Sequence, residues 1–246
     1  MIGLLDVAPD TAVQDTEYVR LLGYPRGHVL ADRALELARL ARTWYAEHGR
    51  PWTYVRRSRS LDVEGNIVVI DGEAFTSGRL ARTLRDAGAD SVALVALSAG
   101  PELEREAADR WQAAAPDEYY FLEVLGSAMV EHLVMMAGAR LCATADAEGH
   151  AVLPHYSPGY PEWNIADQGR LLALTMRDAI AHPLEALDSG MLRPKKSLLA
   201  VFGLTRSTER VPLLTSLLPC QCCSLPRCQY RRAAYLAPRT QVVAGA

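Results

Sequence analysis

Apolar residues recur at three- and four-residue steps between His28 and about His48, in the stretch HVLADRALELARLARTWYAEH. This spacing puts the apolar side chains on one face of a helix, and the Gly49–Pro51 segment supplies a stop. The same reasoning predicts helices over residues 76–90, with Thr76 or Ser77 as the N-cap, over 102–114 after Pro101, and over 165–180.

Three continuous apolar runs have the length of strands. They are GNIVVIDG (65–72), SVALVALSAG (91–100) and KKSLLAVFGLT (195–205). Runs of this length that are bounded by turn residues are typical of buried strands. Because helices and strands alternate along the chain, the pattern predicts an α/β or α+β fold in which helices cover a sheet.

The longest apolar segment extends from about Tyr119 to Cys142 and contains no proline. We expect it to form a central buried helix, with small residues where another backbone packs closely. Glu123, Glu131 and His132 interrupt it, so it lacks the roughly 18 uninterrupted apolar residues that a membrane span requires. No membrane association is therefore predicted.

Composition narrows the class of protein. Half of the 246 residues are apolar, 22% are charged, and the formal net charge is -3. These values argue against a disordered chain and against a nucleic-acid-binding protein. The N-terminus has acidic residues and no basic start before an apolar run, so we expect a cytoplasmic location. The common nucleotide-binding loops and the hydrolase Gly-x-Ser-x-Gly element are absent from the sequence.

Aromatic residues concentrate in the loop LPHYSPGYPEWN (153–164), although they make up only 7% of the chain. Pro158 and Gly159 form a turn pair, because glycine permits a positive φ. Such a loop can present Tyr160 as the flat wall of a binding pocket. It can equally form a tight corner in which Tyr160 and Trp163 fill the core. The residues of the loop alone leave both interpretations open.

Glu131 lies within the long apolar segment, where an unpaired carboxylate would be costly. It therefore needs a cation, a hydrogen-bonding partner or a polar cavity, and a structural ion pair at the helix surface is an equal alternative. His132 is rotated by about 100° from it on a helix, which argues against a catalytic pair of the two residues.

Four cysteines, Cys220, Cys222, Cys223 and Cys228, lie within nine residues near the C-terminus. Four soft ligands so close together could hold zinc or an iron–sulfur cluster. Their spacing is not a repeated Cys-x-x-Cys pair, so reduced thiols or a redox pair remain the alternative. Cys142 is expected to be a core thiol.

Three motifs occur in an order that resembles a known family. GSAMVEHL, HYSPGYPEWNIADQGRLLAL and LDSGMLRPKKSLLAVFGLT together resemble the activation domain of cobalamin-dependent methionine synthase, and in particular its short stand-alone relatives. The resemblance covers roughly residues 119–205. It implies an α+β fold: a twisted antiparallel sheet with flanking helices and a long central helix, here followed by a cysteine-rich C-terminal tail.

The resemblance also implies a division of the chain and a task. Residues 1–117 would be the N-terminal part of the same domain as the core at 118–218, and residues 219–246 a separate cysteine-rich tail. Members of the family bind S-adenosylmethionine, the methyl donor for reductive methylation of cob(II)alamin. The cobalamin would belong to a partner, a corrinoid protein or corrinoid-containing methyltransferase, and a reductase, flavodoxin or ferredoxin would supply the electron.

Carried over residue by residue, the resemblance assigns a ligand-binding role to five positions. Glu131 matches the helix glutamate that accepts the amino or sulfonium charge of the ligand. Tyr160 matches the loop tyrosine that packs on the ligand, with Gly159 shaping the turn and Ser157 offering its backbone. His155 stands where methionine synthase has an arginine for the methionine carboxylate, and a neutral histidine cannot form that ion pair.

Three hypotheses about function follow. The first is a reactivation or accessory factor for a cobalamin-dependent methyltransferase, without an assigned catalytic residue; it would either turn over by itself or act as an accessory subunit. The second is a non-catalytic binding module for a corrinoid protein or another small ligand, favoured by His155 and by the aliphatic LLAVF segment (198–202), which lacks the family's aromatic cluster. The third is an iron–sulfur electron carrier that uses the cysteine tail.

Overall fold

The computed structural model describes residues 3–25, 27–177 and 182–211. Within these residues five strands form one sheet in the order β1-β2-β6-β10-β7, and all neighbouring strands are antiparallel. β6 lies at the centre and pairs with β2 and β10 over nearly its whole length. The strands are β1 Leu4–Asp6, β2 Trp52–Ser58, β6 Ser91–Ser98, β7 Ala151–Val152 and β10 Ser197–Thr205.

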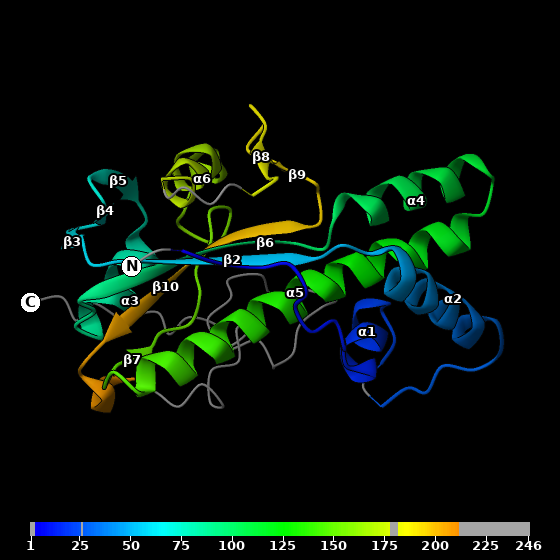
Figure 1. The fold of residues 1–246 in the computed structure, drawn as a ribbon, viewed down its shortest axis with the longest axis horizontal. Helices are drawn as coiled ribbons and strands as arrows, with labels where there is room; N and C mark the ends of the chain where they lie inside the picture. Colours follow the sequence, from blue (N-terminus) through cyan, green and yellow to red (C-terminus); the bar gives the residue numbers. More distant parts are fainter. Residues whose placement is uncertain (1–2, 26, 178–181, 212–246) are drawn as a thin grey trace, which may run out of the picture.

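Helices cover both faces of this sheet (Figure 1). The longest, α5, runs along one face, and α6 lies on the opposite side. A small antiparallel meander and a two-stranded pair complete the described part of the chain. The helices are α1 Asp15–Leu21, α2 Asp32–His48, α3 Gly78–Asp86, α4 Pro101–Gln112, α5 Pro116–Asp146 and α6 Gln168–Thr175, with 3-10 turns at Ile165–Asp167 and Thr208–Arg210. The meander is β3 Leu61–Glu64, β4 Ile67–Ile70 and β5 Glu73–Thr76, and the pair is β8 Glu185–Ala186 with β9 Leu192–Arg193.

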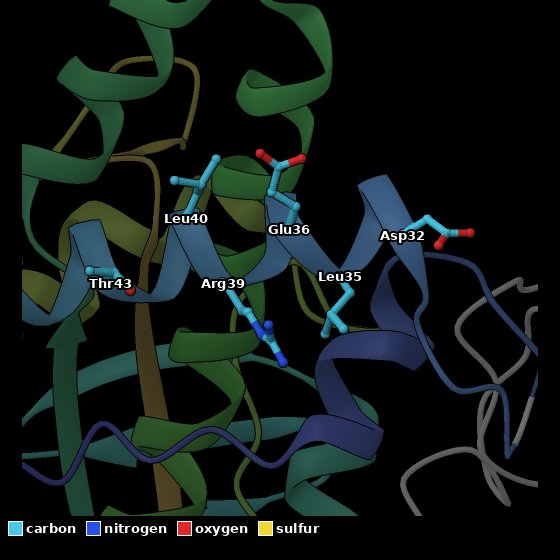
Figure 2. A pocket seen from close by; sticks show the side chains of 6 residues that line it. All are labelled: Asp32, Leu35, Glu36, Arg39, Leu40 and Thr43. Carbon is cyan, nitrogen blue, oxygen red and sulfur yellow. The ribbon is translucent and has the colours of Figure 1, made fainter.

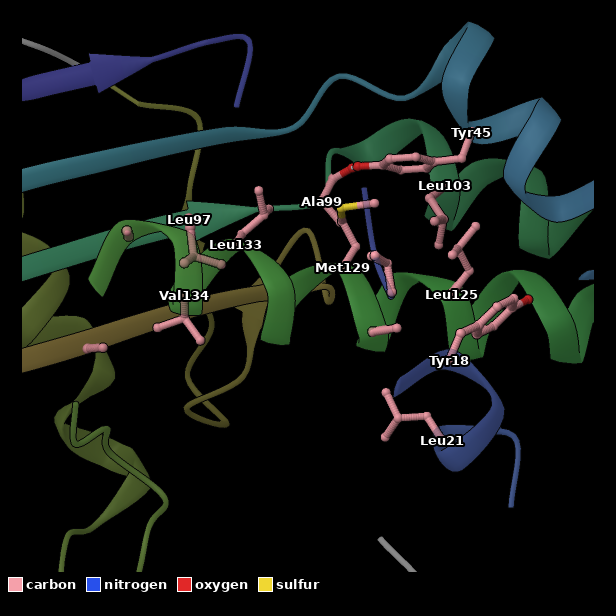
Figure 3. Packing of buried hydrophobic residues seen from close by; sticks show 14 of the residues in the cluster. Tyr18, Leu21, Tyr45, Leu97, Ala99, Leu103, Leu125, Met129, Leu133 and Val134 are labelled. Carbon is pink, nitrogen blue, oxygen red and sulfur yellow. The ribbon is translucent and has the colours of Figure 1, made fainter. Parts of the chain in front are cut away.

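The central strand β6 divides the core into two halves. Every residue of β6 is buried, and its side chains alternate between the two faces because successive residues of a strand point in opposite directions. Leu97 faces α5, where it joins Leu125, Met129 and Leu133 (Figure 3). Leu94 packs on the other face with residues of α3 and α6. The α5 face and the α3/α6 face are therefore separate surfaces of one sheet.

By length and composition alone, α5 could cross a membrane, and it alone meets this test among the residues that the structure describes. However, 56% of its most apolar window is buried inside the fold. It contacts β6 and β10 of the sheet as well as α1, α2 and α4. The burial and these contacts are those of a core helix.

Several predicted elements match the structure and others differ in extent. The helix predicted from 28 to 48 is α2, which begins at Asp32. Ser77, and not Thr76, caps α3, since its side chain accepts a hydrogen bond from the backbone of Leu80. The helix predicted over 165–180 ends at Thr175, and residues 178–181 lie outside the described residues.

The predicted division at residues 117 and 118 lies in the first turn of α5. Strands from both sides of this point share the main sheet: β1, β2 and β6 precede it, and β7 and β10 follow it.

Candidate functional site

The loop at residues 153–164 is folded by successive turns. The backbone N–H of Tyr160 donates to the Ser157 carbonyl at 3.1 Å, and the N–H of Trp163 donates to the Tyr160 carbonyl at 3.0 Å. The N–H of Gly159 donates to the Trp163 carbonyl at 2.9 Å. Gly159 has a φ of 91°, a conformation that side-chain-bearing residues rarely adopt. The predicted role of Pro158 and Gly159 in shaping the turn therefore agrees with the backbone.

Two aromatic residues of the loop anchor it to the α3/α6 face. Tyr156 exchanges backbone hydrogen bonds with Val201 of β10 at 2.9 and 2.8 Å. Trp163 is 3% exposed, and its indole N–H donates to the Asp167 carboxylate at 3.0 Å. Trp163 thus fills the core, as the corner interpretation of the loop expected.

His155 lies on the other side of β10, toward α5, and Tyr160 lies between His155 and Tyr156, with its ring 5.9 Å from the first ring and 5.4 Å from the second. The His155 ring lies 5.5 Å from the ring of Phe202, which belongs to the core cluster on the α5 face. Its Nε2 is 3.2 Å from the Tyr160 hydroxyl. Both side chains are half-buried. Tyr160 therefore stays half-buried between the two rings, whereas Trp163 is buried in the core.

Burial decides the charge of His155. Desolvation lowers the pKa of His155 to about 4, because a charged imidazole loses its hydration in this position. At neutral pH the ring is uncharged, with one nitrogen protonated and the other able to accept a hydrogen bond. His155 therefore offers a neutral, flat, hydrogen-bonding surface and not a cation for a carboxylate.

The helix α5 approaches these aromatic residues closely at Gly138. A Cβ atom at Gly138 would lie 3.1 Å from Cε1 of Phe202, so the small residue lets the helix pack on the ring. Glu131 lies two helical turns earlier on nearly the same side of the helix, about 10 Å along the axis. It is half-buried. The structure thus places Glu131 and His155 on the α5 face of the sheet, with Tyr160 next to His155.

Ser157, the fourth predicted residue, is 1% exposed. Its hydroxyl oxygen has no hydrogen-bond partner among the described residues. Its backbone carbonyl is occupied by the turn to Tyr160. A backbone contact of Ser157 with a ligand therefore stays a prediction.

A cationic cluster beside Glu131 was missed by the sequence reasoning. Nζ of Lys196 donates to the hydroxyl of Ser127 at 2.9 Å and lies 3.2 Å from a carboxylate oxygen of Glu123. Ser127 is one turn before Glu131 on α5. The adjacent lysines before β10 were a visible signal, but nothing local in the sequence connected them to a helix almost 70 residues earlier.

The four cysteines predicted to bind a metal lie outside the described residues. Within the described part of the chain, no group of three or more histidine, cysteine, aspartate or glutamate residues is arranged to hold a metal ion. Cys142 is half-buried against the core on the α5 face, and burial raises the pKa of its thiol. A raised pKa keeps the thiol protonated and unreactive, as expected of a core cysteine.

Two surface hollows lie elsewhere in the fold. The larger, about 350 Å³, is lined in the described residues by one face of α2, including Leu35, Arg39 and Leu40 (Figure 2). The second, about 210 Å³, lies between α2, α4 and the first turns of α5. Neither is lined by a predicted site residue. We place the candidate site at the loop because His155 and Tyr160 bring hydrogen-bonding and aromatic groups together there, on the face of the sheet that α5 covers.

No family model and no curated protein sequence matches this chain. Among solved structures, the chain is similar to the crystal structure of the MetH reactivation domain bound to AdoHcy. The TM-score is 0.61 with 13% sequence identity, and the match covers 82% of this chain and 78% of that chain. At this identity the likeness establishes the fold. It confirms the predicted structural resemblance and the α+β architecture with an antiparallel sheet and a long helix.

Proposed function

We propose that this chain binds S-adenosylmethionine and its demethylated product S-adenosylhomocysteine at the α5 face of the sheet, beside the loop at 153–164. One observation carries the proposal: the MetH domain that shares this fold holds AdoHcy, and here the same fold assembles an acidic, a neutral hydrogen-bonding and an aromatic group on one surface. Such a combination of flat apolar walls and few polar groups is typical of small-molecule sites.

The side chains of this surface suit the chemistry of the ligand. The Glu131 carboxylate can accept the ammonium or attract the sulfonium charge of S-adenosylmethionine. The Tyr160 ring offers a stacking surface for an adenine or ribose. The uncharged His155 can donate or accept a hydrogen bond next to it. Ser157 adds a buried hydroxyl that lacks a partner in the described residues.

We further propose that the chain is a reactivation or accessory factor for a corrinoid-containing methyltransferase of the methionine synthase type. The bound S-adenosylmethionine would supply the methyl group that restores an oxidised cob(II)alamin on the partner protein. The chain's own residues bind and orient the donor, while a reductase, flavodoxin or ferredoxin delivers the electron. We expect the protein to work in the cytoplasm, without nucleic acid or membrane.

Calorimetric titration with S-adenosylhomocysteine tests the binding proposal. The wild-type chain should show saturable one-site binding. Tyr160→Ala should weaken it about 5- to 150-fold, because stacking of a base on an aromatic ring contributes roughly 1–3 kcal/mol. Tyr120→Ala, which removes an exposed tyrosine at the start of α5, serves as the control and should leave the affinity unchanged. Absence of binding to the wild-type chain would refute the proposal.

A second candidate is a non-catalytic module that binds a corrinoid protein or another small ligand. The neutral state of His155 favours it, because no cation stands at this position for a methionine carboxylate. Capture of a corrinoid protein by the full chain, unaffected by S-adenosylmethionine, would support this candidate over the first. The iron–sulfur carrier rests on cysteines outside the described residues, and a colourless, iron-free protein after anaerobic purification would exclude it.

A further inference from the structure

Lys196 occupies an unusual place for a lysine. It directly precedes β10, and its side chain points toward α5 and is only 15% exposed. The helix has a glycine at this point: a Cβ atom at Gly126 would lie 2.9 Å from Cγ of Lys196. The sequence of α5 thus leaves room for the lysine stem, so that the ammonium group is held between helix and strand.

The ammonium group of Lys196 shares its carboxylate partner with a second lysine. Glu123 lies 3.2 Å from Nζ of Lys196 through one carboxylate oxygen and 2.6 Å from Nζ of Lys195 through the other. One carboxylate therefore serves two cations. Glu104 adds a further negative charge, but it faces Lys195, whose backbone N–H it accepts at 3.0 Å. A lysine ammonium has three hydrogens, and its contacts with Ser127 and Glu123 account for two of them.

Lys196 lies close to Glu131. Ser127, which accepts the Lys196 hydrogen bond, and Glu131 are four residues apart on α5, and side chains at this spacing are neighbours with Cβ atoms about 5–6 Å apart. An ammonium and a carboxylate are thus presented one helical turn apart on the same side of the helix. This is the charge pattern that complements an α-amino acid, whose own carboxylate and ammonium are adjacent.

Other cations near the loop belong to a different surface. Arg79 lies over the Tyr156 ring at 5.8 Å, and Arg82 pairs with Glu162 at 2.9 Å. Both arginines are on α3, which packs on the opposite face of the sheet. On the α5 face, the loop itself contributes the uncharged His155. On the α5 face of the described residues, Lys196 contacts Ser127, one helical turn before Glu131.

We propose that Lys196 is the specificity-determining residue for the amino-acid end of the ligand: its ammonium binds the α-carboxylate while Glu131 binds the α-ammonium. The nucleoside end then lies toward Tyr160 and His155. This inference rests on the proposed binding of S-adenosylhomocysteine and adds to it the orientation of the ligand. It also explains how the chain recognises a carboxylate without an arginine at position 155.

Two ligands that differ in one part test this assignment. S-adenosylhomocysteine and 5′-methylthioadenosine share the nucleoside and the sulfur atom, but the second lacks the amino-acid group. Lys196→Met in the full chain should lower the affinity for S-adenosylhomocysteine about tenfold or more, as expected for a lost charge-assisted hydrogen bond. It should leave the affinity for 5′-methylthioadenosine within about twofold. Lys196→Arg should retain binding of both.

Arg193→Met is the matched control, because it removes a nearby exposed cation that pairs with Glu185 and not with Glu123, and it should leave both affinities unchanged. Equal losses for the two ligands in Lys196→Met would mean that Lys196 only supports the fold and would overturn the assignment. An unchanged affinity for S-adenosylhomocysteine would overturn it too, while leaving the proposed function intact. If the wild-type chain binds neither ligand, the proposed function itself fails.

Discussion

The burial of His155 has a measurable consequence for stability at mildly acidic pH. The folded protein holds the pKa of this ring at about 4, whereas an exposed histidine titrates near 6.5. Between these two values the unfolded chain binds the proton and the folded chain does not. Stability contributed by the neutral ring is therefore fully present above pH 6.5 and falls as the pH is lowered toward 4.

The size of the effect follows from the two pKa values. Because the unfolded chain binds one more proton at His155, the free energy of unfolding should fall by about 2 kcal/mol between pH 7.5 and pH 5.0. The loss should reach roughly 3 kcal/mol once the pH is below 4. Other groups also contribute to the pH dependence, among them His182, because burial lowers the pKa of its ring as well. A single stability curve would therefore mix several contributions.

A comparison with His155→Gln separates them. Glutamine cannot titrate, so any packing cost of the substitution is the same at both pH values. Urea unfolding of both proteins at pH 7.5 and pH 5.0 gives four free energies. The loss between the two pH values should be about 2 kcal/mol larger in the wild type than in the variant. Equal losses would show that His155 is not desolvated, and they would refute the claim that the proposed site contains an uncharged His155.

Two further substitutions test the packing that positions the site. Gly203→Ala in β10 should cost about 1–3 kcal/mol in urea unfolding, because a Cβ atom there would lie 2.5 Å from Leu84 and 2.6 Å from Leu153; an unchanged stability would contradict this packing. Ser77→Ala should remove the cap of α3 and cost about 1 kcal/mol, seen as a melting temperature about 2–4 °C lower, whereas a wild-type melting temperature would show that the cap contributes nothing.

Elements with strong local patterns were predictable from the sequence. The central strand β6 is a continuous apolar run, and most of α5 is the long apolar segment from about Tyr119 to Cys142, which has no proline, so both could be recognised alone. β2 was missed because Arg56 and Arg57 interrupt its apolar pattern. In the structure these two arginines pair with distant acids, Asp71 at 2.5 Å and Glu148 at 2.7 Å.

The candidate site was predictable only in part. The turn chemistry of Pro158 and Gly159 and the unusual position of Glu131 in an apolar segment were visible in the sequence. The contrast between the buried Trp163 and the half-buried Tyr160 depends on how the loop turns after Tyr156 pairs with Val201 of β10, which is a contact distant in sequence. The role of Lys196 depends on a contact between β10 and α5, which no local pattern encodes.

The most direct test of the central claim is hydrogen–deuterium exchange of the full chain with and without S-adenosylhomocysteine. The ligand should slow exchange in peptides that cover residues 153–164, while peptides of the β3–β5 meander should be unchanged. Protection confined to the α2 face around residues 32–43, where the larger hollow lies, would contradict the placement of the site. Unchanged exchange throughout, at saturating ligand, would contradict binding itself.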